Sequence, residues 1–279
     1  MTRFTSYDGT ELGYRVIGEG RPLVCLPGGP GRSVDYLGDL GGLDKARQLV
    51  LLDPRGVGSS DDPADPATFR VDRLVPDVEA LRAHLGLDRM DLLAHSAGAE
   101  LATLYAAAHP QRLSALVLVT PGLGLVGIDG NEQDFDAALE RLADEPWYPT
   151  ARAALEKIMT GALSMDAFRD SRPLFYGRWT ETAKAHATLG TAERHQAQRL
   201  GYFAGLTVDP PSTRSALKRL EAPVLLLAGD RDAMVTPAML RQAAPIFNNA
   251  RVAVQSGAAH FPWVDDPAAF TASIGAFLR

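Results

Sequence analysis

The chain has 279 residues, of which 46% are hydrophobic and 22% are charged. This balance predicts a globular protein with a sizeable core and excludes a disordered or fibrous chain. Lys and Arg number 28 against 34 Asp and Glu, which gives a net charge of −6. Nucleic acid is therefore not an expected partner, because binding to phosphates needs an excess of basic side chains.

The sequence also argues against a membrane partner and a secreted location. Its longest apolar runs fall far short of the roughly 20 residues that a helix needs to cross a bilayer. Residues 1–7 are polar and lack the apolar segment of a secretion signal, so we expect a cytoplasmic protein. Cys25 is the single cysteine, which excludes an internal disulfide, and its apolar neighbours predict a buried, unreactive side chain. The oligomeric state does not follow from the sequence.

Short apolar runs alternate with helical patterns along the chain. Six runs predict strands, at residues 22–26, 48–53, 90–95, 113–120, 223–228 and 251–255. Several of these are apolar without alternation, as strands buried on both faces are, so they predict a central, largely parallel sheet. The more polar residues 10–16 alternate in character and predict an antiparallel strand at the sheet edge.

The helical patterns divide the chain into a core and an insertion. Helices are predicted over residues 71–85 and 97–108, and Asp266 followed by Pro267 marks the start of a last helix. The stretch from about residue 121 to 212 has no convincing strand and reads as several short helices. We therefore predict an α/β core formed by residues 1–121 and 213–279, with a helical lid at residues 122–212.

The predicted lid is rich in aromatic side chains. They form the small core of the lid itself or they line a substrate pocket, and we expect about half to do each, because both environments draw on the same residue types. The candidates for substrate contact, with two residues from outside the lid, are Gly28, Trp147, Phe175, Tyr176, Trp179, Tyr202 and Phe261.

Residues 94–98 carry the first chemical motif. They read Ala-His-Ser-Ala-Gly and lie between a predicted strand and a predicted helix. A sharp turn at such a place exposes a serine hydroxyl, and small residues on either side let the backbones approach. Ser96 is therefore the candidate nucleophile, and the alternative is that Ser96 caps the helix. Ala94 stands where the pattern usually has glycine and adds only a methyl group.

A serine nucleophile needs a base and a carboxylate that orients the base. His260 follows the predicted strand 251–255, and Asp230 and Asp232 follow the strand 223–228. The carboxyl ends of parallel strands share one edge of the sheet, where binding and catalytic groups gather. His260 is the candidate base, the other histidines are predicted to be structural or solvated, and spacing alone leaves the choice between the two aspartates open.

Backbone amides are expected to stabilise the oxyanion of a tetrahedral intermediate. The amide of Ala97 directly follows the nucleophile, and Gly29 in the Pro-Gly-Gly-Pro-Gly turn at residues 27–31 supplies the second candidate donor. A phosphate-binding loop is the rival explanation for these glycines, but no Gly-Lys-Ser/Thr follows them. No histidine or cysteine pair has metal-ligand spacing. We therefore expect neither a metal nor a cofactor.

These motifs resemble the α/β-hydrolase fold superfamily, and most of all its group of prolyl aminopeptidases and related esterases, lactonases and carbon–carbon bond hydrolases. The resemblance covers about residues 5–121 and 213–279. Residues 27–31 resemble the His-Gly-Gly-Pro-Gly oxyanion loop of the family, and residues 53–60 its Asp-x-Arg-Gly-x-Gly-x-Ser turn. The family's Gly-x-x-Asp pattern ends on the catalytic acid, which the resemblance places on Asp232.

Two departures from the family pattern bear on function. Pro27 replaces a histidine that braces the oxyanion loop in the family. Prolyl aminopeptidases hold the substrate's amino group with lid glutamates, and the loosely comparable residues 197–203 contain no acid, although Glu181 and Glu193 occur elsewhere in the lid. The serine at the elbow also argues against the haloalkane dehalogenases and epoxide hydrolases of this fold, which use an aspartate.

The sequence thus predicts a serine hydrolase that cleaves an ester or lactone, or an amide, of a small apolar substrate through an acyl-enzyme. Ser96, His260 and Asp232 form the predicted triad. The alternatives are a prolyl aminopeptidase-like peptidase, a carbon–carbon bond hydrolase, and a ligand receptor or non-hydrolytic biosynthetic protein on the same fold.

Overall fold

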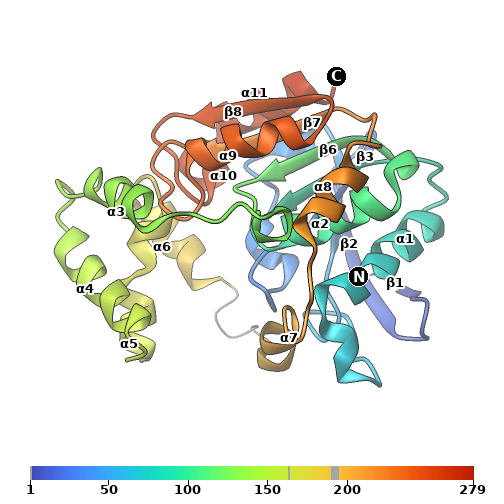
Figure 1. Cartoon of the computed structure of the whole chain (residues 1–279), viewed down its shortest axis with the longest axis horizontal. Helices are drawn as coiled ribbons and strands as arrows, with labels where there is room; N and C mark the ends of the chain where they lie inside the picture. The colour runs from blue at the N-terminus through green and yellow to red at the C-terminus, as the bar shows by residue number, and fades with distance from the viewer. Residues whose placement is uncertain (1, 163, 190–194) are drawn as a thin grey trace.

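A computed structural model describes residues 2–162, 164–189 and 195–279 (Figure 1). Eight strands form one sheet in the order β1-β2-β4-β3-β5-β6-β7-β8. From β4 to β8 all neighbouring strands run parallel, which confirms the predicted α/β class. The strands are β1 (Thr2–Thr5), β2 (Glu11–Ile17), β3 (Pro22–Leu26), β4 (Gln48–Leu52), β5 (Met90–His95), β6 (Leu113–Val119), β7 (Val224–Gly229) and β8 (Ala250–Gln255).

The six predicted parallel strands are β3 to β8, each within one residue of its predicted bounds. The predicted antiparallel strand is β2, but its expected position at the edge was wrong. β1 pairs antiparallel with β2 on the outer side, with Thr2 opposite Tyr14. β1 buries only Phe4 among its four residues, so it carries no apolar run by which the sequence could reveal it.

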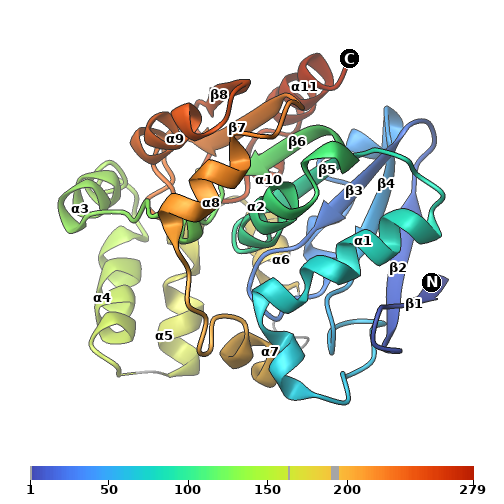
Figure 2. The ribbon, with the colours of Figure 1, turned by 45° about the vertical axis from the view of Figure 1, so that its right-hand side comes forward.

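Helices cover both faces of the sheet (Figure 2). Apolar residues of α1, α2, α8 and α9 pack on one face, and those of α6, α10 and α11 on the other. The helices are α1 (Val75–His84), α2 (Gly98–Ala108), α3 (Glu132–Glu140), α4 (Tyr148–Met159), α5 (Met165–Asp170), α6 (Glu181–Thr188), α7 (Gln196–Gly201), α8 (Pro210–Leu217), α9 (Pro237–Ala243), α10 (Pro262–Asp265) and α11 (Pro267–Phe277). Within the described ranges, no helix combines the length and apolarity needed to span a bilayer.

Burial on both faces explains the continuous apolar runs. In β3, Val24 and Leu26 belong to the core under α1 and α2, whereas Leu23 and Cys25 belong to the core on the opposite face. All four side chains are buried. Burial also raises the pKa of the Cys25 thiol, so Cys25 is a small core residue, as expected.

The chain between β6 and β7 forms helices and turns, with no strand among its described residues. Figures 1 and 2 both show α3, α4 and α5 set apart from the helices that cover the sheet. Residues of α3 and α4 form a small separate core, in which Leu139, Leu142 and Tyr148 pack with Ala233 from the loop after β7. The boundary predicted at residue 212 falls inside α8, and the role of the insertion as a lid stays a prediction.

The turn after β4 is fixed by buried charges. The Arg55 side chain is completely buried and donates to both carboxylate oxygens of Asp77 at 2.6 Å, and also to Asp8. Asp53 accepts hydrogen bonds from the backbone amides of Val34 and Ser59, both at 3.0 Å. This network joins the turn to α1 and to the β1–β2 hairpin, and so holds the end of β4 in place.

We expect Arg55→Met to lower the free energy of unfolding by about 3 kcal/mol, because it leaves the Asp77 carboxylate buried without a counter-charge. Arg70→Met is the matched control, since Arg70 pairs with Asp72 in a partly exposed ion pair and such pairs contribute about 1 kcal/mol or less. Urea denaturation measures both. Equal losses in the two variants would contradict the structural role of Arg55.

Candidate active site

Ser96 occupies a strained turn between β5 and α2. Its φ of 52° lies in the left-handed region that L residues rarely adopt. The turn after β3 packs tightly against it, because a Cβ on Gly28 would lie 2.8 Å from the Ser96 Cβ, and a Cβ on Gly98 would collide with the carbonyl of Pro27. No side chain caps α2, so the alternative role of Ser96 as a helix cap is wrong.

The structure brings Ser96, Asp232 and His260 together at the carboxyl ends of β5, β7 and β8. His260 Nε2 lies 2.9 Å from Ser96 Oγ, and His260 Nδ1 lies 2.9 Å from Asp232 Oδ2. A carboxylate only accepts, so Nδ1 carries the proton and Nε2 accepts from the serine hydroxyl. Asp232 and His260 are buried and Ser96 is half-buried. This geometry suits proton transfer from an accessible hydroxyl to the imidazole.

The two candidate aspartates have different partners. The Oδ1 atom of Asp232 accepts from the amides of Met234 at 2.8 Å and Val235 at 3.1 Å, so the carboxylate is held while Oδ2 faces His260. Asp230 instead accepts from the amide of Gly257 at 2.7 Å. Asp230 therefore joins the loops after β7 and β8, and does not reach the imidazole.

Two backbone donors beside the nucleophile are unpaired. Among the residues that the structure describes, the amides of Gly29 and Ala97 have no hydrogen-bond partner. Gly29 is exposed and Ala97 is half-buried, so both residues are accessible to an acceptor from the solvent or from a substrate. The neighbouring amide of Gly28 is already used, since it donates to the Tyr36 hydroxyl at 2.6 Å.

Asp265 of α10 connects the insertion to the loop of His260, and nothing in the sequence singled it out. Its carboxylate accepts from the amides of Gly177 at 2.9 Å, Arg178 at 3.3 Å and Ala259 at 2.8 Å. Burial raises its pKa to about 6. The amide of His260 also donates to the carbonyl of Phe175 at 3.1 Å. Residues 175–178 are thus fastened directly beside the imidazole.

Two of the predicted aromatic contacts lie next to the reacting groups. The half-buried Phe175 ring has its centroid 6.0 Å from that of His260. The Tyr202 hydroxyl donates to the carbonyl of Ala97 at 2.9 Å. Phe175 and the buried Tyr202 therefore lie close to the predicted triad, and their contact with a substrate stays a prediction.

The other aromatic candidates lie in packed surroundings. Tyr176 and Phe261 are almost completely buried, with ring centroids 5.0 Å apart. The Tyr176 hydroxyl is satisfied by His186 Nδ1 at 2.7 Å. Both rings are therefore packed inside the protein, and their contact with a substrate stays a prediction. Trp179 packs on Tyr176, and Trp147 packs on the small core of the insertion.

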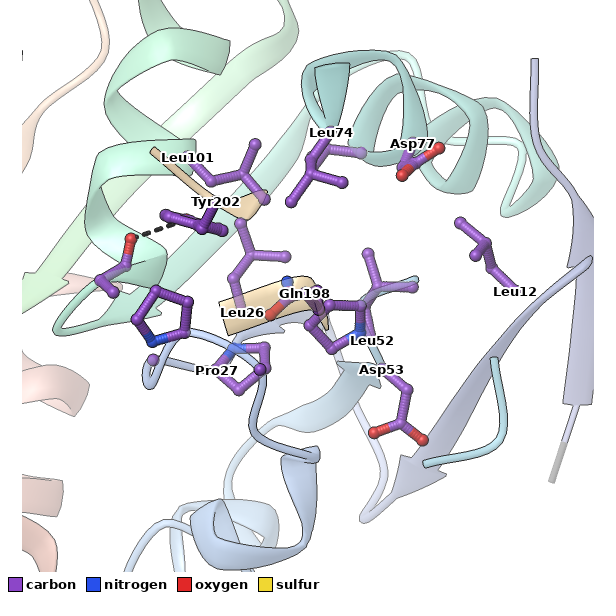
Figure 3. A pocket seen from close by; sticks show the side chains of 16 residues that line it. Leu12, Leu26, Pro27, Leu52, Asp53, Leu74, Asp77, Leu101, Gln198 and Tyr202 are labelled. Atoms are coloured by element: carbon purple, nitrogen blue, oxygen red, sulfur yellow. Dashed lines mark hydrogen bonds between the residues drawn. The ribbon is translucent and has the colours of Figure 1, made fainter. Parts of the chain in front are cut away.

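A largely apolar cavity adjoins the oxyanion loop (Figure 3). Gly28 and Ala97 line it, and both residues are close to Ser96. Its polar wall residues Asp53 and Asp77 have their hydrogen bonds in the turn network described above. Its apolar wall comes from β2, β3, β4, α1, α2 and the residue after α7, namely Leu12, Leu26, Leu52, Leu74, Val78, Leu101 and Tyr202.

Of the two acidic residues considered for the insertion, the structure describes only Glu181. Glu181 is exposed at the start of α6 and pairs with Lys184 at 2.7 Å, and Glu193 lies outside the described residues. Across residues 2–162, 164–189 and 195–279, no three His, Cys, Asp or Glu residues are grouped to hold a metal ion.

Comparison with known proteins identifies the class. A family model described as the alpha/beta hydrolase fold matches residues 21–267. The chain is a hydrolase enzyme, and it belongs to the α/β-hydrolase fold family. A proline iminopeptidase of Levilactobacillus brevis is 29% identical over 95% of this chain and 92% of its own length.

Other proteins resemble this chain over part of its sequence or in fold alone. Proline iminopeptidases of Heyndrickxia coagulans and Saccharolobus solfataricus are 38% and 35% identical, but over only 37% and 52% of their own lengths and 38% and 59% of this chain. An esterase of Exiguobacterium antarcticum superposes with a TM-score of 0.75 at 18% identity, covering 99% of this chain and 98% of its own. At that identity, the likeness concerns the fold.

We expect His186 to make the fold sensitive to acid. Burial lowers the pKa of His186 to about 4, whereas an unfolded histidine titrates near 6.5. Between these values the unfolded chain binds one more proton, so stability falls as pH falls. From pH 7 to pH 5 this costs about 2 kcal/mol of unfolding free energy. Urea denaturation at both pH values gives the loss of unfolding free energy between pH 7 and pH 5. We expect this loss to be smaller by that amount in His186→Gln than in the wild type. An equal loss in the two proteins would show that His186 is not its source.

Proposed function

We propose that the protein is a serine hydrolase that cleaves an ester or lactone with a small apolar acyl part. One observation carries this proposal: the continuous hydrogen-bonded chain Asp232–His260–Ser96, with both links at 2.9 Å. The unpaired amides of Gly29 and Ala97 support it, because together with the chain they make up the groups that acyl transfer needs.

In the first half of the proposed reaction, Ser96 Oγ attacks the substrate carbonyl while its proton passes to His260 Nε2. The carbonyl oxygen becomes an oxyanion that accepts from the amides of Gly29 and Ala97. Asp232 keeps the imidazole oriented and stabilises the imidazolium that forms. The protonated Nε2 then gives its proton to the leaving alcohol, the bond to that alcohol breaks, and an acyl-enzyme remains on Ser96.

In the second half, a water molecule replaces the alcohol. His260 Nε2 takes a proton from the water, the hydroxide attacks the acyl carbonyl, and the same two amides stabilise the second oxyanion. When the intermediate collapses, Nε2 returns the proton to Ser96 Oγ and the acid leaves. With a lactone, the alcohol and the acid are parts of one product.

The cavity beside the oxyanion loop supports an apolar acyl part. Gly28 and Ala97 line it next to Ser96, and we expect an acyl group attached to Ser96 to extend toward it. Leu26, Leu52 and Leu101 supply an apolar wall, which favours aliphatic groups over charged ones. The substrate we propose is therefore a small molecule.

Aminopeptidase activity toward an N-terminal proline is the second candidate, because the Levilactobacillus brevis relative matches nearly the whole chain. Such a substrate carries a charged amino group that needs an acidic partner. Gln198, in the stretch compared with the lid glutamates of prolyl aminopeptidases, lines the cavity and is neutral. The esterase proposal therefore ranks first.

Ser96→Ala is expected to lower kcat on a nitrophenyl ester by at least about 10⁴-fold, because it removes the nucleophile. The wild type is expected to gain the mass of one adduct after incubation with a small fluorophosphonate, and the variant to gain none. Intact-mass spectrometry measures the adduct. A variant that still reacts would place the nucleophile elsewhere.

The two candidate functions differ in their preferred substrate. We expect kcat/KM for a short-chain nitrophenyl ester to exceed that for a prolyl arylamide, because Gln198 is neutral and the Asp53 and Asp77 carboxylates are engaged in the turn after β4. Initial rates with the same enzyme preparation give the ratio, with Ser96→Ala as the background control. A higher kcat/KM for the arylamide would reverse the order of the two proposals.

A further inference from the structure

A buried polar chain behind the nucleophile contains two residues outside the triad. Tyr36 lies in a short 3₁₀-helix, Val34–Leu37, between β3 and β4, and His95 is the last residue of β5. Tyr36 is only 1% exposed and His95 only 2%. Polar groups buried to this degree need hydrogen-bond partners, and their partners define what they hold together.

This hydrogen-bonded chain of side chains runs from the oxyanion loop, residues 27–31, to the loop that contains His260. The amide of Gly28 donates to the Tyr36 hydroxyl oxygen at 2.6 Å, and that oxygen lies 2.7 Å from His95 Nδ1. His95 Nε2 lies 2.9 Å from the carbonyl oxygen of His260. A carbonyl only accepts, so Nε2 carries the proton and Nδ1 accepts from the Tyr36 hydroxyl. Every bond in the chain then has one donor and one acceptor.

The surroundings of His95 keep it in this one form. Burial and the neighbouring His260 and Arg32 hold its pKa well below the ordinary value, so the ring stays neutral. The Trp263 ring packs edge-on against it with centroids 4.9 Å apart, and Phe261 lies at 5.4 Å. These contacts fix the plane of the imidazole, and thereby the direction of both its hydrogen bonds.

We propose that Tyr36 and His95 are positioning residues that set the oxyanion loop and the His260 loop at a fixed separation, an inference that rests on the proposed function. Gly28 directly precedes Gly29, whose amide is the proposed oxyanion donor. The carbonyl at the other end belongs to His260 itself. Breaking the chain therefore moves a stabilising donor and the base relative to each other, although neither is altered chemically.

The test is Tyr36→Phe, which removes only the hydroxyl. We expect kcat on the ester to fall about 10- to 100-fold, because small displacements of catalytic groups have effects of this size, with KM changed less than threefold. Inhibition by a small alkyl boronic acid, which forms a tetrahedral adduct on the serine, is expected to weaken by a similar factor.

Tyr105→Phe is the matched control. It also removes the hydroxyl of a completely buried tyrosine, which donates to Glu79 Oε2 at 2.7 Å and takes no part in the hydrogen-bonded chain of Tyr36 and His95. We expect Tyr105→Phe to lower the thermal stability as Tyr36→Phe does, while kcat stays within about threefold of the wild type. Equal kcat losses in the two variants, or a normal kcat in Tyr36→Phe, would overturn the proposal.

Amide hydrogen exchange tests the coupling without any turnover. In Tyr36→Phe we expect faster exchange both in residues 27–31 and in residues 256–262, and in Tyr105→Phe we expect wild-type exchange in residues 27–31. Faster exchange in the first segment alone would show that the two loops are not coupled. A wild type that forms no fluorophosphonate adduct would count against the proposed function, whereas the exchange result would still decide the coupling.

Discussion

The close approach of two turns, after β3 and after β5, is the constraint on which the site depends. Ser96 has a left-handed φ of 52°. A Cβ on Gly28 would meet the Ser96 side chain, and a Cβ on Gly98 would meet the carbonyl of Pro27. This contact places the turn at residues 27–31 beside Ser96. A parallel sheet makes the contact possible because β3 and β5 are neighbours whose carboxyl ends share one edge.

Around this contact, loops that are distant in sequence are joined by hydrogen bonds from backbone amides to side-chain oxygens, and not by apolar packing alone. Asp230 joins the loops after β7 and β8, and Asp265 joins the His260 loop to the insertion at Gly177. The Tyr36 hydroxyl accepts from the amide of Gly28 in the turn at residues 27–31, where Pro27 offers no polar side chain. A carboxylate or hydroxyl that accepts a hydrogen bond from a backbone amide fixes the conformation of the loop, because the N–H group must point at the acceptor.

The insertion contributes differently in its two halves. α3, α4 and the loop after β7 share a small core, in which Trp147 packs, whereas residues 175–178 lie against the imidazole. The aromatic residues expected either to line a pocket or to form a core differ in where they lie. Tyr176 and Phe261 pack under the site, whereas Phe175 and Tyr202 lie at it. Composition alone could not make this division, because both environments use the same residue types.

The sequence by itself determined the α/β class, six strands of the sheet, the elbow at Ser96 and the glycine turn that contains Gly29. These features depend on local patterns: apolar runs for buried strands, and small residues where backbones must approach. Spacing left the choice between Asp230 and Asp232 open, because both follow the same strand, and the resemblance alone favoured Asp232. The tertiary structure shows that it is Asp232 whose carboxylate lies against His260. It also revealed β1, which buries one residue, and the pair Tyr36 and His95. Their partners are far away in the sequence, so no local pattern records the hydrogen bonds that hold them.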